Sequence, residues 1–122
     1  MRSNEEHNEQ RLLFEWWDVM SKRYNVPREL MFAIPNGGKR NVVTAKLLKD
    51  EGVRAGIPDV FLAVPRGCFH GLFIEMKKRK GGVVSDFQKS MIERLNDQGY
   101  MAIVCNGAEA AVTVIVEYLT SI

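Results

Sequence analysis

Two short apolar runs near the middle of the chain, joined by a turn, constrain the fold more than any other feature. Residues 60–64 and 72–77 are rich in Val, Leu, Ile and Phe, and residues 65–71 between them begin with Pro and end with Gly. Apolar runs bounded by turn residues in this way are typical of strands joined as a hairpin. The sequence therefore predicts that these residues form a buried β-hairpin.

Charged side chains lie within or next to these apolar strands. If Val64 faces Leu72 across the connection, Asp59 lies opposite Lys77. Asp59, Glu75 and Lys77 then project from one face at one end of the hairpin, because side chains alternate along a strand. A slip by one residue would turn Asp59 to the other face, so the register decides whether the three side chains meet.

Two interpretations account for these three side chains. A carboxylate in a buried strand costs several kcal/mol unless it is paired or bound to a metal. The two acids and the lysine could neutralise one another at the end of the strand pair. They could instead bind Mg²⁺, which prefers oxygen ligands and activates a bound water for attack on a phosphate ester. Lys77 would then hold the water or the phosphate.

Hydrophobic periodicity and capping residues predict helices on both sides of the hairpin. An apolar stripe runs through residues 4–24 and ends before Pro27, and Ser85 with Gln88 matches a capping box whose helix carries Phe87 on its apolar face. The order helix, strand, helix, two hairpin strands, helix, strand, helix predicts an α/β fold, a mixed β-sheet flanked by helices, in a single domain over residues 1–122. Outside the hairpin we expect helices at residues 4–24, 41–52, 85–99 and 106–119, and strands at residues 30–34 and 102–105.

Composition limits the cellular setting. The chain has 122 residues, of which 46% are hydrophobic, and this suits one domain with a packed core. No apolar run approaches about 18 residues, so no membrane span is expected. Residues 1–10 lack the apolar core of a signal peptide, and Cys68 and Cys105 are too far apart for a CxxC metal site. These features predict a cytoplasmic protein with two free thiols.

Basic residues gather in two segments although the net charge is only +2. Residues 36–54 begin with a glycine turn whose backbone N–H groups could bind a phosphate. The second segment follows directly on the second hairpin strand. Such clusters indicate an anionic partner such as nucleic acid, or else two solvated faces. The candidate nucleic-acid-binding residues are Asn36, Gly37, Lys39, Arg40, Arg54, Lys78, Arg79 and Lys80.

Two further polar residues have a structural explanation of their own. Gln88 is the third helical residue of the Ser85 capping box, a position that needs no catalytic role. Glu9 lies four residues before Leu13 and so extends the apolar stripe of the first helix towards the sheet. Glu9 could equally be an exposed acid favoured near a helix N-terminus.

The order of these motifs resembles a known family. Pro58-Asp59 followed by Glu75-Met76-Lys77 resembles the signature of the PD-(D/E)XK nuclease superfamily. Further matching segments make the chain similar, over nearly its whole length, to the VRR-NUC family. They are Glu9-Gln10, residues 35–40, residues 52–59, residues 70–77, Gln88 and Gly99-Tyr100.

The resemblance implies a restriction-endonuclease-like core and cleavage of DNA that depends on Mg²⁺ or Mn²⁺. It implies that Asp59 and Glu75 bind the metal, with the main-chain carbonyl of Met76 as a further ligand. Lys77 would assist the nucleophile. The resemblance also implies that an acid on the first helix completes the metal site, which we assign to Glu9. Gln88 would contact water or phosphate, in addition to its place in the capping box.

The resemblance also carries expectations about assembly and substrate. Small stand-alone members of the family, including phage-encoded ones, resemble Holliday-junction resolvases and act as homodimers. We therefore expect a homodimeric cytoplasmic endonuclease, acting in the host cytoplasm if it is phage-encoded, that resolves branched DNA, four-way junctions above all. The alternatives are a nuclease directed to flaps or nicks, and a module that binds DNA without cutting it.

Overall fold

A four-stranded sheet forms the centre of the protein. The computed structural model describes residues 3–35 and 42–121. In the sheet, β1 pairs with β2 and β2 with β3 in antiparallel fashion, whereas β3 and β4 are parallel, as their connection through a helix requires. The mixed sheet predicted from the sequence is confirmed. The strands are β1 (Met31–Ala33), β2 (Val60–Leu62), β3 (Leu72–Lys77) and β4 (Met101–Asn106).

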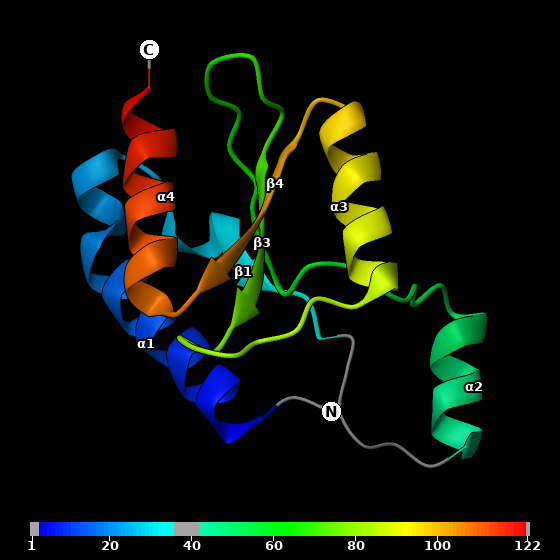
Figure 1. Ribbon diagram of the computed structural model, residues 1–122. Coiled ribbons are helices and arrows are strands. Elements are labelled where there is room, and N and C mark those ends of the chain that lie inside the picture. Colours follow the sequence, from blue (N-terminus) through cyan, green and yellow to red (C-terminus); the bar gives the residue numbers. More distant parts are fainter. Residues whose placement is uncertain (1–2, 36–41, 122) are drawn as a thin grey trace.

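Helices cover both faces of the sheet. In Figure 1, α1 (Asn4–Met20) and α4 (Ala108–Thr120) lie side by side on one face, and α3 (Asp86–Asp97) lies on the other. Helix α2 (Val42–Asp50) stands away from the sheet, beyond the start of α3. No helix in residues 3–35 or 42–121 has both the length and the apolar character needed to cross a membrane.

Alternation along β3 places the main hydrophobic core on one face of the sheet and Phe73, Glu75 and Lys77 on the other. Leu72, Ile74 and Met76 are fully buried in one core cluster with residues of α1 and α4, among them Trp17 and Ile115. Each large apolar side chain buried in this way stabilises the fold by about 1.5–3 kcal/mol relative to exposure. The residues between them, including Glu75 and Lys77, therefore point to the face that α3 covers.

The first helix and the first hairpin strand end earlier than predicted. Helix α1 ends at Met20, a 3₁₀ helix continues over Ser21–Tyr24, and Asn25 adopts the left-handed conformation that turns the chain before Pro27. Strand β2 covers three residues rather than five. Its partner strand β1 begins at Met31, directly after a 3₁₀ helix at Arg28–Leu30, so β1 has no further strand residues with which residues beyond Leu62 could pair. Asn41, the first residue of the helix predicted at residues 41–52, lies outside the described residues.

The predicted hairpin register is wrong by two residues. Leu72 pairs with Leu62 rather than with Val64. The connection is longer than expected, because residues 63–65 leave the ladder and the tip closes through a separate bridge between Arg66 and Phe69. A shift of two preserves the faces, since side chains alternate with a period of two. Continued by one residue, the observed register places Asp59 opposite Glu75 instead of Lys77.

Two local predictions have opposite outcomes in α3. The capping box is confirmed, because Ser85 Oγ accepts the Gln88 N–H and Gln88 Oε1 accepts the Ser85 N–H. The prediction that Phe87 lies on the packed apolar face of α3 is wrong, because Phe87 is 70% exposed. The part of α3 that packs on the sheet is narrower than the spacing of its hydrophobic residues suggests.

Both cysteines are free thiols, as predicted. Cys68 is exposed in the hairpin connection, whereas Cys105 is buried in the core. Burial raises the pKa of the Cys105 thiol to about 11. The thiolate is the reactive form, so Cys105 has a packing role.

Candidate active site

Asp59 is fixed at the point where the chain enters β2. Its main-chain carbonyl accepts the N–H of Ile34 at 2.7 Å, which ties it to the β1 side of the sheet. Its side-chain Oδ2 accepts the N–H of Met76 at 2.8 Å. Asp59 precedes β2, so here a side-chain oxygen, rather than a main-chain carbonyl of β2, accepts this N–H of β3. Asp59 is half-buried. The first hydrogen bond fixes its main chain, and the second holds its carboxylate beside β3.

Glu75 is a buried carboxylate in the middle of the sheet, with only 2% of its surface exposed. Its Oε2 accepts a hydrogen bond from Gln88 Nε2 at 3.0 Å and lies 3.7 Å from Lys77 Nζ. A buried charge is tolerated when it is paired and hydrogen-bonded in this way. The structure thus brings Asp59, Glu75 and Lys77 together at one end of the β2–β3 pair.

The side-chain amide of Gln88 makes two hydrogen bonds, one through its oxygen and one through its nitrogen. Its Oε1 completes the capping box at Ser85, and its Nε2 donates to Glu75. Gly56 lets this end of α3 approach the loop before Asp59. Gly56 has φ +84°, and a Cβ at this position would lie 2.3 Å from the carbonyl oxygen of Phe87. Gly56 therefore serves both as a turn before Asp59 and as a close contact between two segments of the site.

Lys77 is 7% exposed, although it carries a charge. Its aliphatic stem packs against Gly82, where a Cβ would lie 2.8 Å from Lys77 Cβ. Gly82 is not among the site residues predicted from the sequence. The sequence feature that could have indicated a close contact here is the Gly-Gly pair at residues 81–82, directly after the basic run.

The donor set at this end of the sheet fits a small divalent cation. Mg²⁺ is commonly held by one or two carboxylates, with waters and substrate phosphates as the remaining ligands. Asp59, directly before β2, and Glu75, on β3, supply two carboxylates, and Asp59 Oδ2 accepts the N–H of Met76, the residue after Glu75. Within residues 3–35 and 42–121, no three His, Cys, Asp or Glu side chains are grouped so as to hold a metal ion.

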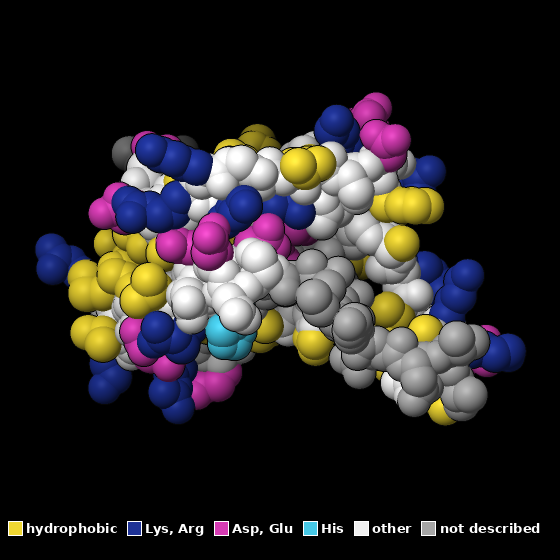
Figure 2. Space-filling model, turned by 60° about the horizontal axis from the view of Figure 1, so that its bottom comes forward, with side chains coloured by type: hydrophobic (Ala, Val, Ile, Leu, Met, Phe, Trp, Pro, Cys, Tyr) yellow, Lys and Arg dark blue, Asp and Glu magenta, His cyan; other side chains and the backbone are white. Residues whose placement is uncertain are grey.

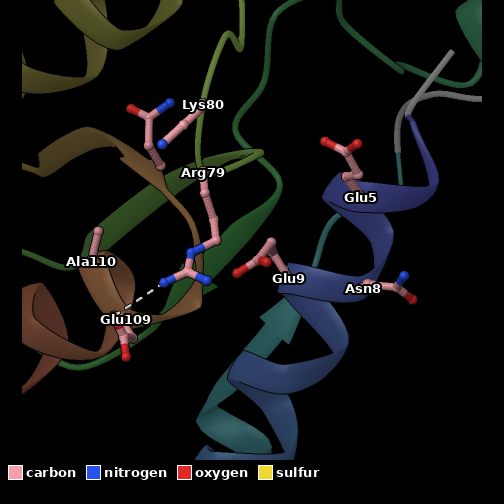
Figure 3. A pocket seen from close by; sticks show the side chains of 8 residues that line it. Glu5, Asn8, Glu9, Arg79, Lys80, Glu109 and Ala110 are labelled. Carbon is pink, nitrogen blue, oxygen red and sulfur yellow. Dashed lines mark hydrogen bonds and ion pairs between the residues drawn. The ribbon is translucent and has the colours of Figure 1, made fainter.

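The carboxylate of Glu9, on α1, contacts the start of α4. Its Oε1 accepts the N–H of Ala108 at 2.7 Å. Figure 3 shows Glu9 reaching from α1 towards Arg79 and α4, in a pocket of about 790 Å³. Both basic and acidic side chains line the pocket, among them Glu5, Glu9, Arg79, Lys80 and Glu109.

The predicted nucleic-acid-binding residues fall into two groups. Those of the glycine turn, Asn36, Gly37, Lys39 and Arg40, lie outside the described residues. Arg54, Arg79 and Lys80 are exposed, Lys78 is half-buried, and Arg79 Nη2 lies 3.5 Å from Glu109 Oε2. Figure 2 turns the bottom of the view in Figure 1 towards the reader. On this face, Asp and Glu side chains lie near the middle, with Lys and Arg side chains directly beside them.

Comparison with known proteins gives a consistent result. The family model described as VRR-NUC domain matches residues 3–109. A solved structure titled "VRR_NUC domain protein" has a TM-score of 0.80 and 28% sequence identity, and the alignment covers 97% of this chain and 90% of that one. A search of curated proteins gave no match. The family match spans most of the chain, and the fold agrees with a restriction-endonuclease-like core. The chain therefore belongs to the VRR-NUC family and is a nuclease-type domain.

Proposed function

We propose that this protein is a divalent-metal-dependent endonuclease that hydrolyses phosphodiester bonds in branched DNA. The observation that carries the proposal is the β2–β3 register, which, continued by one residue, sets Asp59 opposite Glu75, with Lys77 Nζ buried 3.7 Å from Glu75 Oε2. Two carboxylates and a lysine at the end of a strand pair, in a nuclease-type domain, have the composition of a metal-assisted hydrolytic site.

Each residue of the site has a separate task in this proposal. Asp59 and Glu75 would hold the cation, with the main-chain carbonyl of Met76 completing the protein's share of the ligands. When bound there, Mg²⁺ or Mn²⁺ supplies a more acidic water and offsets negative charge on the phosphate. Lys77 positions the attacking water or the phosphate with its ammonium group. Gln88 keeps Glu75 Oε2 in place through the hydrogen bond of 3.0 Å.

The substrate proposal rests on the basic segment and on symmetry. Lys78, Arg79 and Lys80 follow the end of β3 and are positioned to contact a DNA backbone next to the site. Resolving a four-way junction needs two cuts at symmetry-related positions, and a twofold homodimer presents two equivalent sites. We propose that four-way junctions are the preferred substrate, with specificity for DNA shape rather than base sequence. The complete set of Asp59, Glu75 and Lys77 argues against a module that only binds DNA.

Cleavage of matched substrates tests the proposal. We expect the purified protein to cut a four-way junction faster than a flap or a linear duplex of the same sequence, in Mg²⁺ or Mn²⁺ but not in chelator. Light scattering should give the mass of a dimer. A Glu75→Gln preparation, purified in parallel, controls for contaminating nucleases. Cutting in chelator would contradict metal dependence, whereas a monomer that prefers flaps would overturn only the junction and dimer parts.

The basic segment after β3 allows a prediction about binding alone. Changing Lys78, Arg79 and Lys80 together to Gln should weaken DNA binding and lower the slope of log K against log salt by about 2–3, because each lost phosphate contact removes about 0.9. A salt titration of DNA affinity measures this slope. As a control, changing Lys22 and Arg23, exposed at the other end of α1 from Glu9, should leave the slope unchanged. An unaltered slope in the triple variant would show that residues 78–80 do not contact DNA.

A further inference from the structure

Phe87 is a large apolar side chain that the local structure of α3 does not require. It is 70% exposed, and the helix start is already capped on either side of it by the reciprocal hydrogen bonds of Ser85 and Gln88. Single exposed apolar side chains are common on protein surfaces, so exposure alone assigns no role to Phe87. Its position and its neighbours are more informative.

The first turn of α3 connects Phe87 to the end of the sheet that carries the carboxylates. Gln88, the next residue, donates to Glu75 at 3.0 Å, and a Cβ at Gly56 would lie 2.3 Å from the carbonyl oxygen of Phe87. In Figure 1, the first turn of α3 and the end of β3 both lie at the lower end of the sheet. The exposed ring is therefore attached one residue, about 3.8 Å along the main chain, from a side chain of the site.

A groove of about 330 Å³ lies beside the ring of Phe87. This volume is at the lower end of the range of about 300–1,000 Å³ for small-molecule sites, so the groove suits a group the size of a nucleobase. Most of its lining comes from α3, at spacings of three and four residues that bring side chains to one face of a helix. The groove is lined by Ala55, Asp86, Phe87, Ser90, Met91 and Arg94.

The side chains of this groove match the parts of a nucleotide. Phe87 offers a ring on which a base can stack, and the oxygens of Asp86 and Ser90 can accept N–H groups from the edge of a base. Arg94 is exposed and forms no ion pair with any described residue, so its charge is available to a phosphate. The core of an interface with a second copy would be depleted of charged residues, whereas this lining holds an acid and a base.

We propose that this groove binds an unpaired base of the DNA strand next to the cut, with the base stacked on Phe87. The identity of the substrate rests on the proposed function, and the groove adds the feature of branched DNA that the protein uses. A base must leave the duplex stack before an aromatic side chain can cover its face, and a branch point lowers the cost of that step. Stacking accepts any base, because every base has a π-face, and this agrees with selection by shape rather than by sequence.

Binding to strands with and without bases tests the contact. The probes are a fluorescent single strand of mixed sequence and a strand of the same length made of abasic nucleotides, measured by anisotropy in chelator so that no cutting intervenes. Phe87→Ala should weaken binding of the first strand about 5- to 150-fold, the size of one lost stacked base, and leave binding of the abasic strand unchanged. Phe87→Trp should bind as the unchanged protein does, whereas Phe87→Leu, which is apolar without a π-face, should bind as Phe87→Ala does.

The control is Val83→Ala, which trims a side chain that is 79% exposed, precedes α3 and does not line the groove. It should leave the affinity for both strands unchanged. A four-way junction with one abasic nucleotide, placed in turn at each position around the branch point, locates the base. One position in each cut strand should weaken binding by the unchanged protein and have no further effect on Phe87→Ala, because the same contact is already lost.

Four results would overturn the proposal: equal losses on the two single strands, full affinity in Phe87→Leu, a loss in Val83→Ala that matches Phe87→Ala, and no sensitive position in the junction. Light scattering tests the other occupant, since a fall from dimer to monomer in Phe87→Ala would show that a second copy covers the groove. If Phe87→Ala does not fold, the comparison of Phe87→Trp with Phe87→Leu still decides. If the unchanged protein cuts no DNA, the proposed function fails, while the single-strand measurements still test the groove.

Discussion

Asp59→Asn is expected to reduce cleavage at least about a thousandfold, because a metal contributes several kcal/mol to stabilising charge in the transition state and each 1.36 kcal/mol is about tenfold in rate. The fold should be preserved. An Asn oxygen can still accept the Met76 N–H that Asp59 Oδ2 accepts at 2.8 Å, so the substitution removes the charge and retains the hydrogen bond. Single-turnover cleavage with excess enzyme measures the chemical step directly.

The control for Asp59→Asn is Asp97→Asn, which neutralises an exposed acid at the end of α3. Circular dichroism and thermal melting of both variants should match those of the unchanged protein. Near-normal metal-dependent cleavage by purified Asp59→Asn would rule out Asp59 as a metal-binding residue. Loss of activity in both variants would instead point to an effect of overall charge.

Lys77→Met is expected to destabilise the metal-free protein by about 3 kcal/mol or more, because it leaves the buried carboxylate of Glu75 without its cation. Both side chains are more than nine-tenths buried, at 7% and 2% exposure, so solvent screens their interaction weakly. Asp59, on the facing strand position, adds a second negative charge to the same region. Urea unfolding of the metal-free protein measures the free energy of unfolding.

The matched variant is the double substitution of Lys77→Met with Glu75→Gln, which removes both charges. It should be more stable than Lys77→Met alone, with a coupling energy of about 0.5–3 kcal/mol for residues in direct contact. Additive effects of the two substitutions would show that the pair does not stabilise the fold. Lys77→Met should also lower cleavage by orders of magnitude with little change in DNA affinity, because one cation is a small share of the phosphate contacts.

The elements that the sequence predicted well are those set by local patterns. Strand β3 has the predicted limits because Gly71 and the basic run bound its apolar residues, and the Ser85 capping box depends only on residues three apart. The hairpin register was wrong because Ala63 and Val64 look like strand residues, whereas their pairing depends on the length of β1. The error left the site assembled, since a shift of two keeps Asp59 and Glu75 on one face.

Contacts between distant segments were beyond sequence reasoning. The hydrogen bond of Glu9 to Ala108 joins residues 99 positions apart, and no periodicity in either helix indicates it. The second bond of Gln88, to Glu75, depends on how α3 docks on the sheet. The exposure of Phe87 has the same origin: periodicity defines a hydrophobic stripe, but docking decides which part of it is covered.

The side chain of Asp59 ends the β2–β3 ladder on the side of the site, while the tip of the hairpin lies at the other end of the same two strands. An insertion between Gly67 and Cys68, the exposed residues of this tip, therefore lengthens a surface loop and leaves the register of Asp59 and Glu75 as it is. A single residue inserted between Asp59 and Val60 would turn the carboxylate to the opposite face. This hairpin therefore tolerates a change of length at Gly67 and Cys68 but not between Asp59 and Val60, and an affinity tag or a fluorescent label can be placed at the tip without disturbing the carboxylates.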